Sequence, residues 1–256
     1  MLGARTFLST KLASAWQRRL RPLWSQAQEL LFPPACVLCG QPGEEGQLLC
    51  TGCAPEWPLI DLAQACPRCG KPETGGQVCG SCQTHPPAWD RAFVPFPYAP
   101  PVDDLLRQFK FHNRLAAGRL LSQRWLAAFS AQQDIEARPL PDCVIPVPLH
   151  PKRIRERGYN QSLELLRTLA PQLGVRIEHK PAQRVRATSA QMGLSAKDRQ
   201  HNLDGAFVIN APLPRHIALF DDVITTGSTL AELSKIARAA GAEVIEVWAI
   251  ARTAKH

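Results

Sequence analysis

The stretch FDDVITTGST, residues 220–229, combines two kinds of side chain that bind different parts of one ligand. Asp221 and Asp222 can accept hydrogen bonds from the hydroxyls of a sugar. The residues behind them suit a phosphate, because backbone N–H groups at a helix start and nearby hydroxyls surround an anion. They are Thr225, Thr226, Gly227, Ser228 and Thr229. A sugar that carries a 5′-phosphate would satisfy both halves of this motif.

The position of the motif favours a ligand site over a purely structural role. The apolar run HIALF predicts a buried strand at 216–220, which places the two acids at its carboxyl end. Open α/β sheets bind their ligands at that edge. The alternative is a capped helix behind two solvated acids. The paired acids together with the complete TTGST favour the ligand site.

Eight of the nine cysteines form four C-x-x-C pairs, a spacing that is typical of metal ligands. The pairs are Cys36 with Cys39, Cys50 with Cys53, Cys66 with Cys69, and Cys79 with Cys82. Four thiolates complete a tetrahedral zinc shell, so these pairs predict two structural zinc ions. Redox-active pairs or an iron–sulfur cluster are alternatives, but repeated pairs with short loops favour zinc. The spacing leaves open whether the pairs combine sequentially or the first combines with the third.

The cysteine pattern also indicates a compartment. Paired metal-binding thiols, with Cys143 alone in an apolar run, fit a reducing cytoplasm better than a disulfide framework. No apolar run is long enough to cross a membrane. The acid-poor N-terminus superficially resembles a transit peptide, but apolar residues at helical spacing between Leu12 and Leu23 predict an amphipathic helix. We therefore expect a soluble, cytoplasmic protein.

Composition along the chain predicts three parts. The 256 residues are 45% hydrophobic, which suffices for a sizeable core and a smaller module. The expected N-terminal amphipathic helix at 1–31 is followed at 32–87 by a segment rich in Cys, Gly and Pro. That segment needs a metal, because it has too few apolar residues for a core of its own. Residues 88–256 form the expected α/β domain.

Alternating elements within the last part predict its architecture. Apolar residues recur at helical spacing from Val102 to Phe129. Apolar runs and helical runs then alternate, with strands expected at 143–149, 205–210, 216–220 and 243–251 and helices at 162–173 and 229–241. This alternation predicts a mostly parallel sheet with helices on both faces.

The charge of the chain favours an anionic partner. The net charge is +8, and residues 151–200 hold eleven Lys and Arg against four acids, an excess of seven positive charges. Single-stranded nucleic acid would use a positive groove with stacking aromatics, for which Phe109, Phe111 and Tyr159 are candidates. A solvated basic face is the alternative, and the residues alone leave both open.

Longer motifs give the chain a resemblance to known families. Residues 220–229 resemble the phosphoribosyl diphosphate loop of type I phosphoribosyltransferases, a match that covers about residues 140–251. VPLHPKRIRERGYNQS at 147–162 and R-x-R-x-T-x-x-Q at 184–191, with cysteine knuckles ahead of them, resemble the ComF family of competence proteins. The resemblance covers nearly all of the chain after Leu30. It implies a phosphoribosyltransferase-like domain behind a double zinc ribbon.

The resemblance also implies roles for particular residues. Asp221 and Asp222 would hold ribose hydroxyls, residues 225–229 the 5′-phosphate, and Lys152 and Arg153 the diphosphate with Mg²⁺. A mobile loop over the site would include Arg184, Arg186, Thr188, Gln191 and Arg199. No catalytic residue is assigned, because Thr225 stands where many purine transferases carry an acid.

The ComF family is associated with uptake of transforming DNA by bacteria, and some relatives with use of DNA as a nutrient. The resemblance therefore implies single-stranded DNA as a partner, and competence or DNA-processing proteins that dock through the zinc ribbon. The candidate DNA-binding residues are Lys152, Arg153, Arg155 and Arg157. Two hypotheses follow. The chain handles incoming single-stranded DNA on a phosphoribosyl-diphosphate-binding fold, or it is an active phosphoribosyltransferase with an unknown acceptor.

Overall fold

The structure is a computed structural model that describes residues 35–43, 47–186 and 205–254. The chain divides into two compact units, Met1–Trp57 and Pro58–His256. The helix expected at 1–31 lies outside the described residues, as do three of the expected mobile-loop residues, Thr188, Gln191 and Arg199. In the described part of the chain, no helix combines the length and apolar character that a membrane crossing requires.

The described part of the first unit is built from turns that bring its cysteines together. An isolated antiparallel bridge joins Ala35 to Pro42. Beside it, the N–H of Cys36 donates to the carbonyl of Gln41 at 2.7 Å. The turn contains Gly40 with a φ of 77°, a value that favours glycine. These short hydrogen-bonded turns position thiols, and they bury few apolar side chains.

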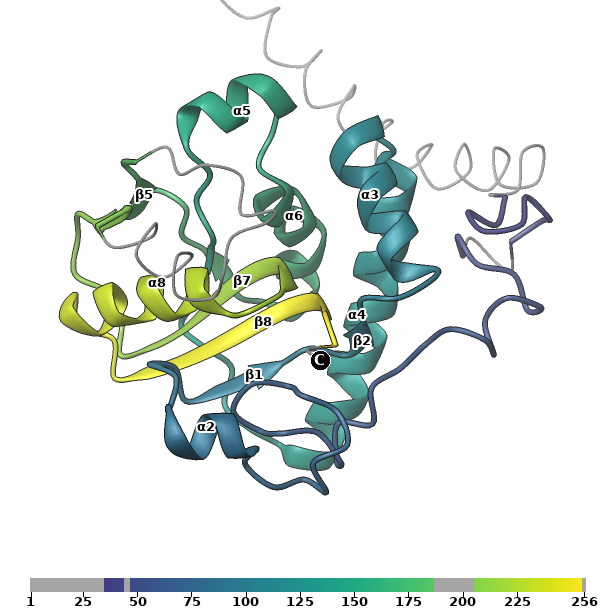
Figure 1. Cartoon of the computed structure of the whole chain (residues 1–256). Coiled ribbons are helices and arrows are strands. Elements are labelled where there is room, and N and C mark those ends of the chain that lie inside the picture. The colour runs from purple at the N-terminus through teal and green to yellow at the C-terminus, as the bar shows by residue number, and fades with distance from the viewer. Residues whose placement is uncertain (1–34, 44–46, 187–204, 255–256) are drawn as a thin grey trace, which may run out of the picture. The chain divides into compact units, whose positions relative to one another are not determined.

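A six-stranded sheet forms the centre of the second unit (Figure 1). Its strands are, in spatial order, β1 (Arg91–Phe93), β8 (Val244–Arg252), β7 (His216–Ile224), β3 (Cys143–Pro146) and β4 (Arg176–Ile177), with β2 (Phe96–Pro97) also paired to β8. Every pairing in this sheet is parallel, which confirms the predicted α/β fold. The strand expected at 205–210 lies outside it, because β6 (Phe207–Ile209) pairs antiparallel with β5 (Ala182–Arg184).

The central strand β7 is longer than its apolar run predicts. It continues to Ile224 because β8 runs beside it, with Asp221 opposite Ala249 and Ile224 opposite Arg252. The strand therefore ends at Ile224 and not at Phe220, and the two acids lie in its carboxyl half. The preceding residues are buried on both faces of the sheet, which explains their continuous apolar character.

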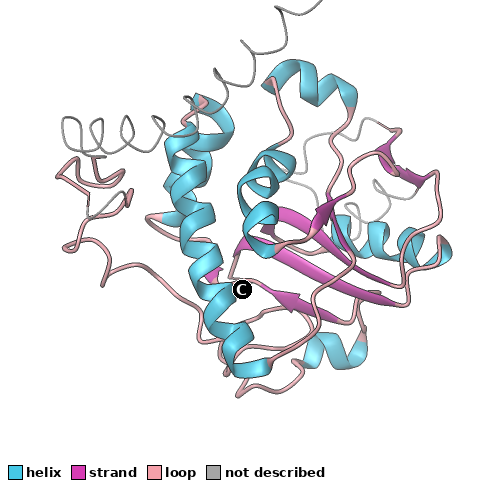
Figure 2. Cartoon of the chain, turned by 180° about the vertical axis from the view of Figure 1, so that it is seen from behind, coloured by secondary structure: helices cyan, strands magenta, loops and turns pink. Residues whose placement is uncertain are grey.

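Helices cover both faces of the sheet. α8 (Ser228–Ala239) packs against β7 and β8 on one face (Figure 1), whereas α4 (Leu115–Glu136) and α6 (Gln161–Leu173) lie on the other (Figure 2). The remaining described helices are α2 (Gly80–Thr84), α3 (Val102–His112), which packs on α4, and α5 (Pro151–Arg157), which follows β3.

The helical run predicted from Val102 to Phe129 is two helices, α3 and α4. They are separated at Asn113, whose φ of 53° is left-handed.

An aromatic cluster fixes α4 to the sheet. Trp125 is fully buried, stacks on Phe129 with ring centroids 5.0 Å apart, and donates its indole N–H to the carbonyl of Ala249 at 2.9 Å. On α4, Gly118 lets α3 approach closely, since a Cβ there would lie 2.7 Å from the ring of Phe109. The sheet therefore positions α4, and α4 positions the end of α3.

The second group of cysteines belongs to the same compact unit as the sheet. Its four thiols are buried in the apolar cluster that contains Trp89 and Val94. Trp89 donates its indole N–H to the carbonyl of Arg68 at 2.6 Å, and Arg68 donates back to the carbonyl of Trp89 at 3.1 Å. The N–H of Ala92, in β1, donates to the carbonyl of Pro67. This second group of cysteines, Cys66 to Cys82, is called the second knuckle below. It is joined to the sheet by its backbone as well as by apolar packing.

Candidate functional site

The paired acids on β7 lie at the centre of a small polar network. Asp221 accepts hydrogen bonds through Oδ1 from the hydroxyl of Ser162 at 3.2 Å and from the N–H of Asp222 at 2.9 Å. Asp222 forms an ion pair through Oδ2 with Nζ of Lys110 at 2.8 Å. Both side chains of this ion pair are mostly buried, since Asp222 is 13% exposed and Lys110 is 18% exposed. The acids are therefore held in place and are not two freely solvated charges.

The electrostatics of Asp221 are unusual. Burial, followed by the charge of Asp222, raises the pKa of Asp221 from its ordinary 3.8 to about 7. Lys110, the N–H of Asp222 and the hydroxyl of Ser162 oppose this increase but do not cancel it. A carboxyl whose pKa lies near neutrality can hold or release a proton in response to a bound ligand.

Lys110 is a residue of this site that the sequence did not single out. It lies in the last turn of α3, where a cation is common because it interacts favourably with the helix dipole. Its position next to Asp222 depends on the packing of α3 on α4 and of α4 on the sheet, which no local pattern reveals. Ser162, in contrast, is the last residue of the motif at 147–162, although that motif does not indicate its contact with Asp221.

The hydroxyl-rich loop after β7 leads into α8, a helix of 12 residues. The hydroxyls of Thr226 and Ser228 are hydrogen-bonded at 2.7 Å, and the N–H of Ser228 donates to Oγ1 of Thr226 at 3.3 Å. Gly227 has a φ of 78°, and an added Cβ would lie 3.0 Å from the indole of Trp89. Glycine is thus required here by backbone and packing alone, so valine at this position would be damaging whether or not a phosphate binds.

Cations from two segments approach the acids. Lys152 and Arg153 lie in the first turn of α5, where the ring of His150 accepts the N–H of Lys152 at 3.2 Å. Burial, followed by the charge of Arg153, lowers the pKa of Arg184, while Asp221 raises it. Arg184 therefore lies within electrostatic reach of Arg153 and, separately, of Asp221. Of the predicted mobile-loop residues, Arg184 and Arg186 are described, the former half-buried and the latter exposed.

The remaining cations of α5 lie beside the end of α3. Arg155 is exposed, and the guanidinium of Arg157 lies over the ring of Phe111, 5.4 Å from its centroid. Phe109 is buried, so the expectation that it stacks on bases is wrong. Its ring contacts that of Tyr159, whose hydroxyl donates to the carbonyl of Phe109. Of the three expected stacking residues, Phe111 is exposed, Tyr159 is half-buried and Phe109 is buried.

The cysteines form two clusters that fit zinc. Cys36, Cys39, Cys50 and Cys53 form one and Cys66, Cys69, Cys79 and Cys82 the other, with all sulfurs of a cluster within 4.8 Å of one another. Two sulfur pairs, one from each cluster, are 3.6 and 3.8 Å apart. Tetrahedral zinc with Zn–S bonds of about 2.3 Å separates sulfurs by about 3.8 Å. The pairs therefore combine sequentially, and the interleaved arrangement is wrong.

In each cluster one thiol, Cys36 or Cys79, has a lowered pKa, whereas two others have raised pKa values. Burial would raise the pKa of the Cys36 thiol, but N–H groups of Cys39, Cys50 and Leu38 lower it to about 6. A thiol that ionises readily is a good zinc ligand. Cys143 differs, since burial followed by the charge of Glu178 raises its pKa to about 11. Cys143 is therefore a buried core residue outside both clusters, as its place in an apolar run predicts.

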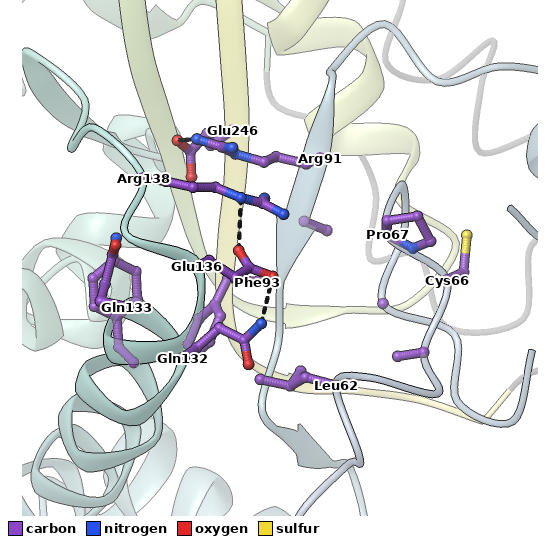
Figure 3. Close-up of a pocket in the computed structure, with 14 residues that line it drawn as sticks. Leu62, Cys66, Pro67, Arg91, Phe93, Gln132, Gln133, Glu136, Arg138 and Glu246 are labelled. Carbon is purple, nitrogen blue, oxygen red and sulfur yellow. Dashed lines mark hydrogen bonds and ion pairs between the residues drawn. The ribbon is translucent and has the colours of Figure 1, made fainter. Parts of the chain in front are cut away.

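A cavity of about 90 Å³ lies between the second knuckle, β1 and the end of α4 (Figure 3). Its charged lining residues are paired with one another. Arg138 contacts Glu136 at 2.7 Å, and Arg91 contacts Glu246. Because these opposite charges neutralise each other, the described lining of the cavity lacks an unpaired charge that could bind a charged ligand.

Fold and site together define an α/β protein with two four-thiolate zinc sites and, at the carboxyl end of a parallel sheet, paired acids beside cations and a hydroxyl-rich loop. Residues 27–83 match the model of the double zinc ribbon domain. The DNA utilization protein YhgH of Escherichia coli O6:H1 is 37% identical over 227 residues, which are 88% of this chain and 99% of that protein. Competence protein F of Haemophilus influenzae is 40% identical over 210 residues, 80% of this chain and 90% of that protein.

The chain belongs to the ComF family. A more distant relative, competence protein ComFC of Streptococcus pneumoniae, is 26% identical over 240 residues, 85% of this chain and 99% of that protein. Among solved structures, hypoxanthine phosphoribosyl transferase of Trypanosoma cruzi matches with a TM-score of 0.32 and 11% identity, over 53% of this chain and 73% of that chain. A likeness at that level carries no inference about the ligand.

Proposed function

We propose that this chain serves DNA utilisation or uptake by binding single-stranded DNA along α5. The observation that carries the proposal is the composition and exposure of this helix. Four of its seven residues are Lys or Arg, and none of its residues is buried. The names of the relatives, a DNA utilization protein and a competence protein, support a DNA-related role.

The chemistry of such a surface is suited to a phosphate backbone. Lys and Arg on one short helix present several charges to successive phosphates, and binding releases the cations condensed on the nucleic acid. Arg184 would extend this positive surface toward the acids on β7. Binding of this kind is strong at low salt and depends little on base sequence.

Titration of the purified protein with labelled single-stranded DNA at several salt concentrations tests the proposal. We expect a variant with Lys152→Ala, Arg153→Ala, Arg155→Ala and Arg157→Ala to bind more weakly. Its salt dependence should flatten by about 0.7 in logarithmic slope for each phosphate that the variant no longer neutralises. A matched control removes four exposed cations from other elements, Arg119, Arg167, Arg176 and Arg215. Equal weakening in both variants would show that only net charge matters, and would overturn the assignment to α5.

A second candidate function is binding and transfer of a phosphoribosyl group. The observation that favours it is the arrangement of Asp221, Asp222 and the loop at 225–229, with acids for ribose hydroxyls and hydroxyls for a phosphate. Lys110 pairs with Asp222, so the acids alone are not an open cation site. Mg²⁺ would therefore enter with the diphosphate, whose oxygens are the ligands that this ion prefers. Lys152 and Arg153 would then face the diphosphate.

Calorimetry with phosphoribosyl diphosphate and Mg²⁺ tests this second function. We expect Asp221→Ala with Asp222→Ala to weaken binding by about 100-fold, because each charged acceptor contributes a strong hydrogen bond. The matched control, Asp103→Ala with Asp104→Ala, removes two acids from the first turn of α3 and should bind normally. No binding by the wild type would reject the function. Binding without diphosphate release over a panel of acceptors would leave a ligand site and reject the transferase.

A further inference from the structure

Phe111 is an aromatic side chain with no place in the core. Phe111 is 64% exposed at the end of α3, and in the described part of the chain every other Phe, Tyr and Trp is buried or half-buried. Burial of a phenylalanine ring is favourable, and this ring lies exposed in a strongly basic region. The residues around it indicate what would cover it.

One side of the ring already carries a cation. The guanidinium of Arg157 lies over the ring, 5.4 Å from its centroid, and the same side chain contacts Oε1 of Gln161 at 3.4 Å. This second interaction restricts the guanidinium. Because the ring remains mostly exposed with Arg157 in place, much of its surface is still available for stacking. A cation on one side of an aromatic ring also favours a phosphate nearby.

The end of α3 is held firmly against its neighbours. On one side of Phe111 in the sequence, Lys110 is paired with Asp222 at 2.8 Å. One residue earlier, the carbonyl of Phe109 accepts the hydroxyl of Tyr159, which follows α5. The backbone that carries Phe111 is therefore held in a defined position relative to Tyr159, just after α5. Such a preformed position lowers the entropic cost of stacking.

We propose that Phe111, with Arg157 over one side, is a stacking position for a nucleobase of the single-stranded DNA that lies along α5. This inference rests on the proposed DNA-binding function and adds an interaction with the bases. The cations of α5 would hold the backbone, and the ring would hold one unstacked base. Every base has an aromatic face, so the position tolerates any sequence. The charge around the ring favours a nucleic acid over an apolar protein segment.

The experiment compares two oligomers of equal length and charge, an oligothymidine and an abasic oligomer that keeps only the sugar–phosphate backbone. We expect the wild type to bind the oligothymidine about fivefold or more tightly than the abasic oligomer. Phe111→Ala should reduce this ratio to near parity and leave the salt dependence unchanged, whereas Phe111→Trp should retain it. The control Ile135→Ala removes another exposed apolar side chain, 78% exposed on α4, and should change neither.

The possible outcomes distinguish failure of the stacking position from failure of the proposed DNA binding along α5. Equal, salt-dependent binding of both oligomers by the wild type would overturn the stacking position and leave the basic surface intact. A base preference that survives Phe111→Ala would place the stacking ring elsewhere and also overturn it. Binding of thymidine monophosphate with the same dependence on Phe111 would assign the ring to free nucleotides and overturn it as well. Absence of DNA binding by the wild type would overturn both the inference and the proposed function.

Discussion

Two buried carboxylate sites on neighbouring strands of one sheet differ in how their charge is balanced. Glu246, toward the start of β8, accepts from three side chains, Arg91, His216 at 2.7 Å and Trp248 at 2.9 Å. At the carboxyl half of β7, Asp221 and Asp222 share one ion-paired lysine, a serine hydroxyl and a backbone N–H. One carboxylate at Glu246 thus has three side-chain donors. The two carboxylates of Asp221 and Asp222 have only three donors between them.

The number of hydrogen-bond donors distinguishes an acid that stabilises the fold from acids that bind a ligand. A buried carboxylate with all its donors present contributes to the fold and has no need of a further partner. Two adjacent carboxylates with few donors retain unfavourable repulsion, which a ligand's hydroxyls or a cation can relieve. This excess of acid is the physical reason for expecting a ligand on β7 and none at Glu246.

The largest expected effect is on the structural acid. Glu246→Ala would leave the side chains of Arg91, His216 and Trp248 without their shared acceptor, at a cost of about 3–5 kcal/mol. We expect thermal unfolding to show a Tm lower by roughly 10 °C. The control Glu243→Ala removes an exposed acid paired with Arg215 and should cost less than about 1 kcal/mol. A small change for both variants would mean that the donors at Glu246 contribute little.

The second prediction concerns Asp221, whose replacement should stabilise the protein at high pH, whereas replacement of Glu246 should destabilise it. Its pKa in the folded protein is about 7, above its ordinary 3.8, so the folded state holds the proton more tightly than the unfolded state. Its contribution to stability is therefore present below about pH 4 and declines as the pH rises through about 7. Asp221→Asn should weaken this pH dependence and raise the Tm at pH 8 by a few degrees.

The matched control for that prediction is Asp222→Asn, which removes the charge that Lys110 pairs with. This variant should be slightly destabilised at pH 8. If both asparagine variants are equally destabilised, Asp221 is as well compensated as Glu246, and the contrast between the two sites disappears.

The smallest effect is expected from Lys110. Lys110→Met removes the cation that lowers the pKa of Asp221, so this pKa should rise further above about 7. The free energy of unfolding should change by only about 1 kcal/mol, because the two neighbouring acids can take up a proton in place of the lost cation. Titration of the Asp221 carboxyl carbon by NMR measures the pKa directly. Arg107→Met, which removes a cation paired with acids in the first turn of α3, should leave it unchanged.

The sequence predicts those parts of the molecule that depend on local patterns. The parallel sheet follows from alternating apolar and helical runs, and the zinc ligands follow from C-x-x-C turns, whose cysteines are close in the chain. The motif at 220–229 likewise contains both acids and the loop. The roles proposed for those residues stay predictions, since geometry alone does not identify a ligand.

Interactions between distant segments are where local patterns give no information. Arg91 and Glu246 are 155 residues apart, and nothing near either residue indicates the other. Lys110 reaches Asp222 only because aromatic packing fixes α4 to the sheet. The length of β7 depends in the same way on β8, since the pairing of Ile224 with Arg252 extends the strand past its apolar run.

The packing of Trp89 against Gly227 connects metal supply to the loop of the candidate site. The ring of Trp89 lies against Gly227, the residue before α8, and its indole N–H donates to the carbonyl of Arg68, between Cys66 and Cys69. Zinc bound at the second knuckle would hold that carbonyl in place, and the carbonyl accepts the indole N–H that positions Trp89 beside the loop. In a cell that is short of zinc, newly made chains would lack this support, so occupancy of the proposed phosphate site would follow the metal content of the cell.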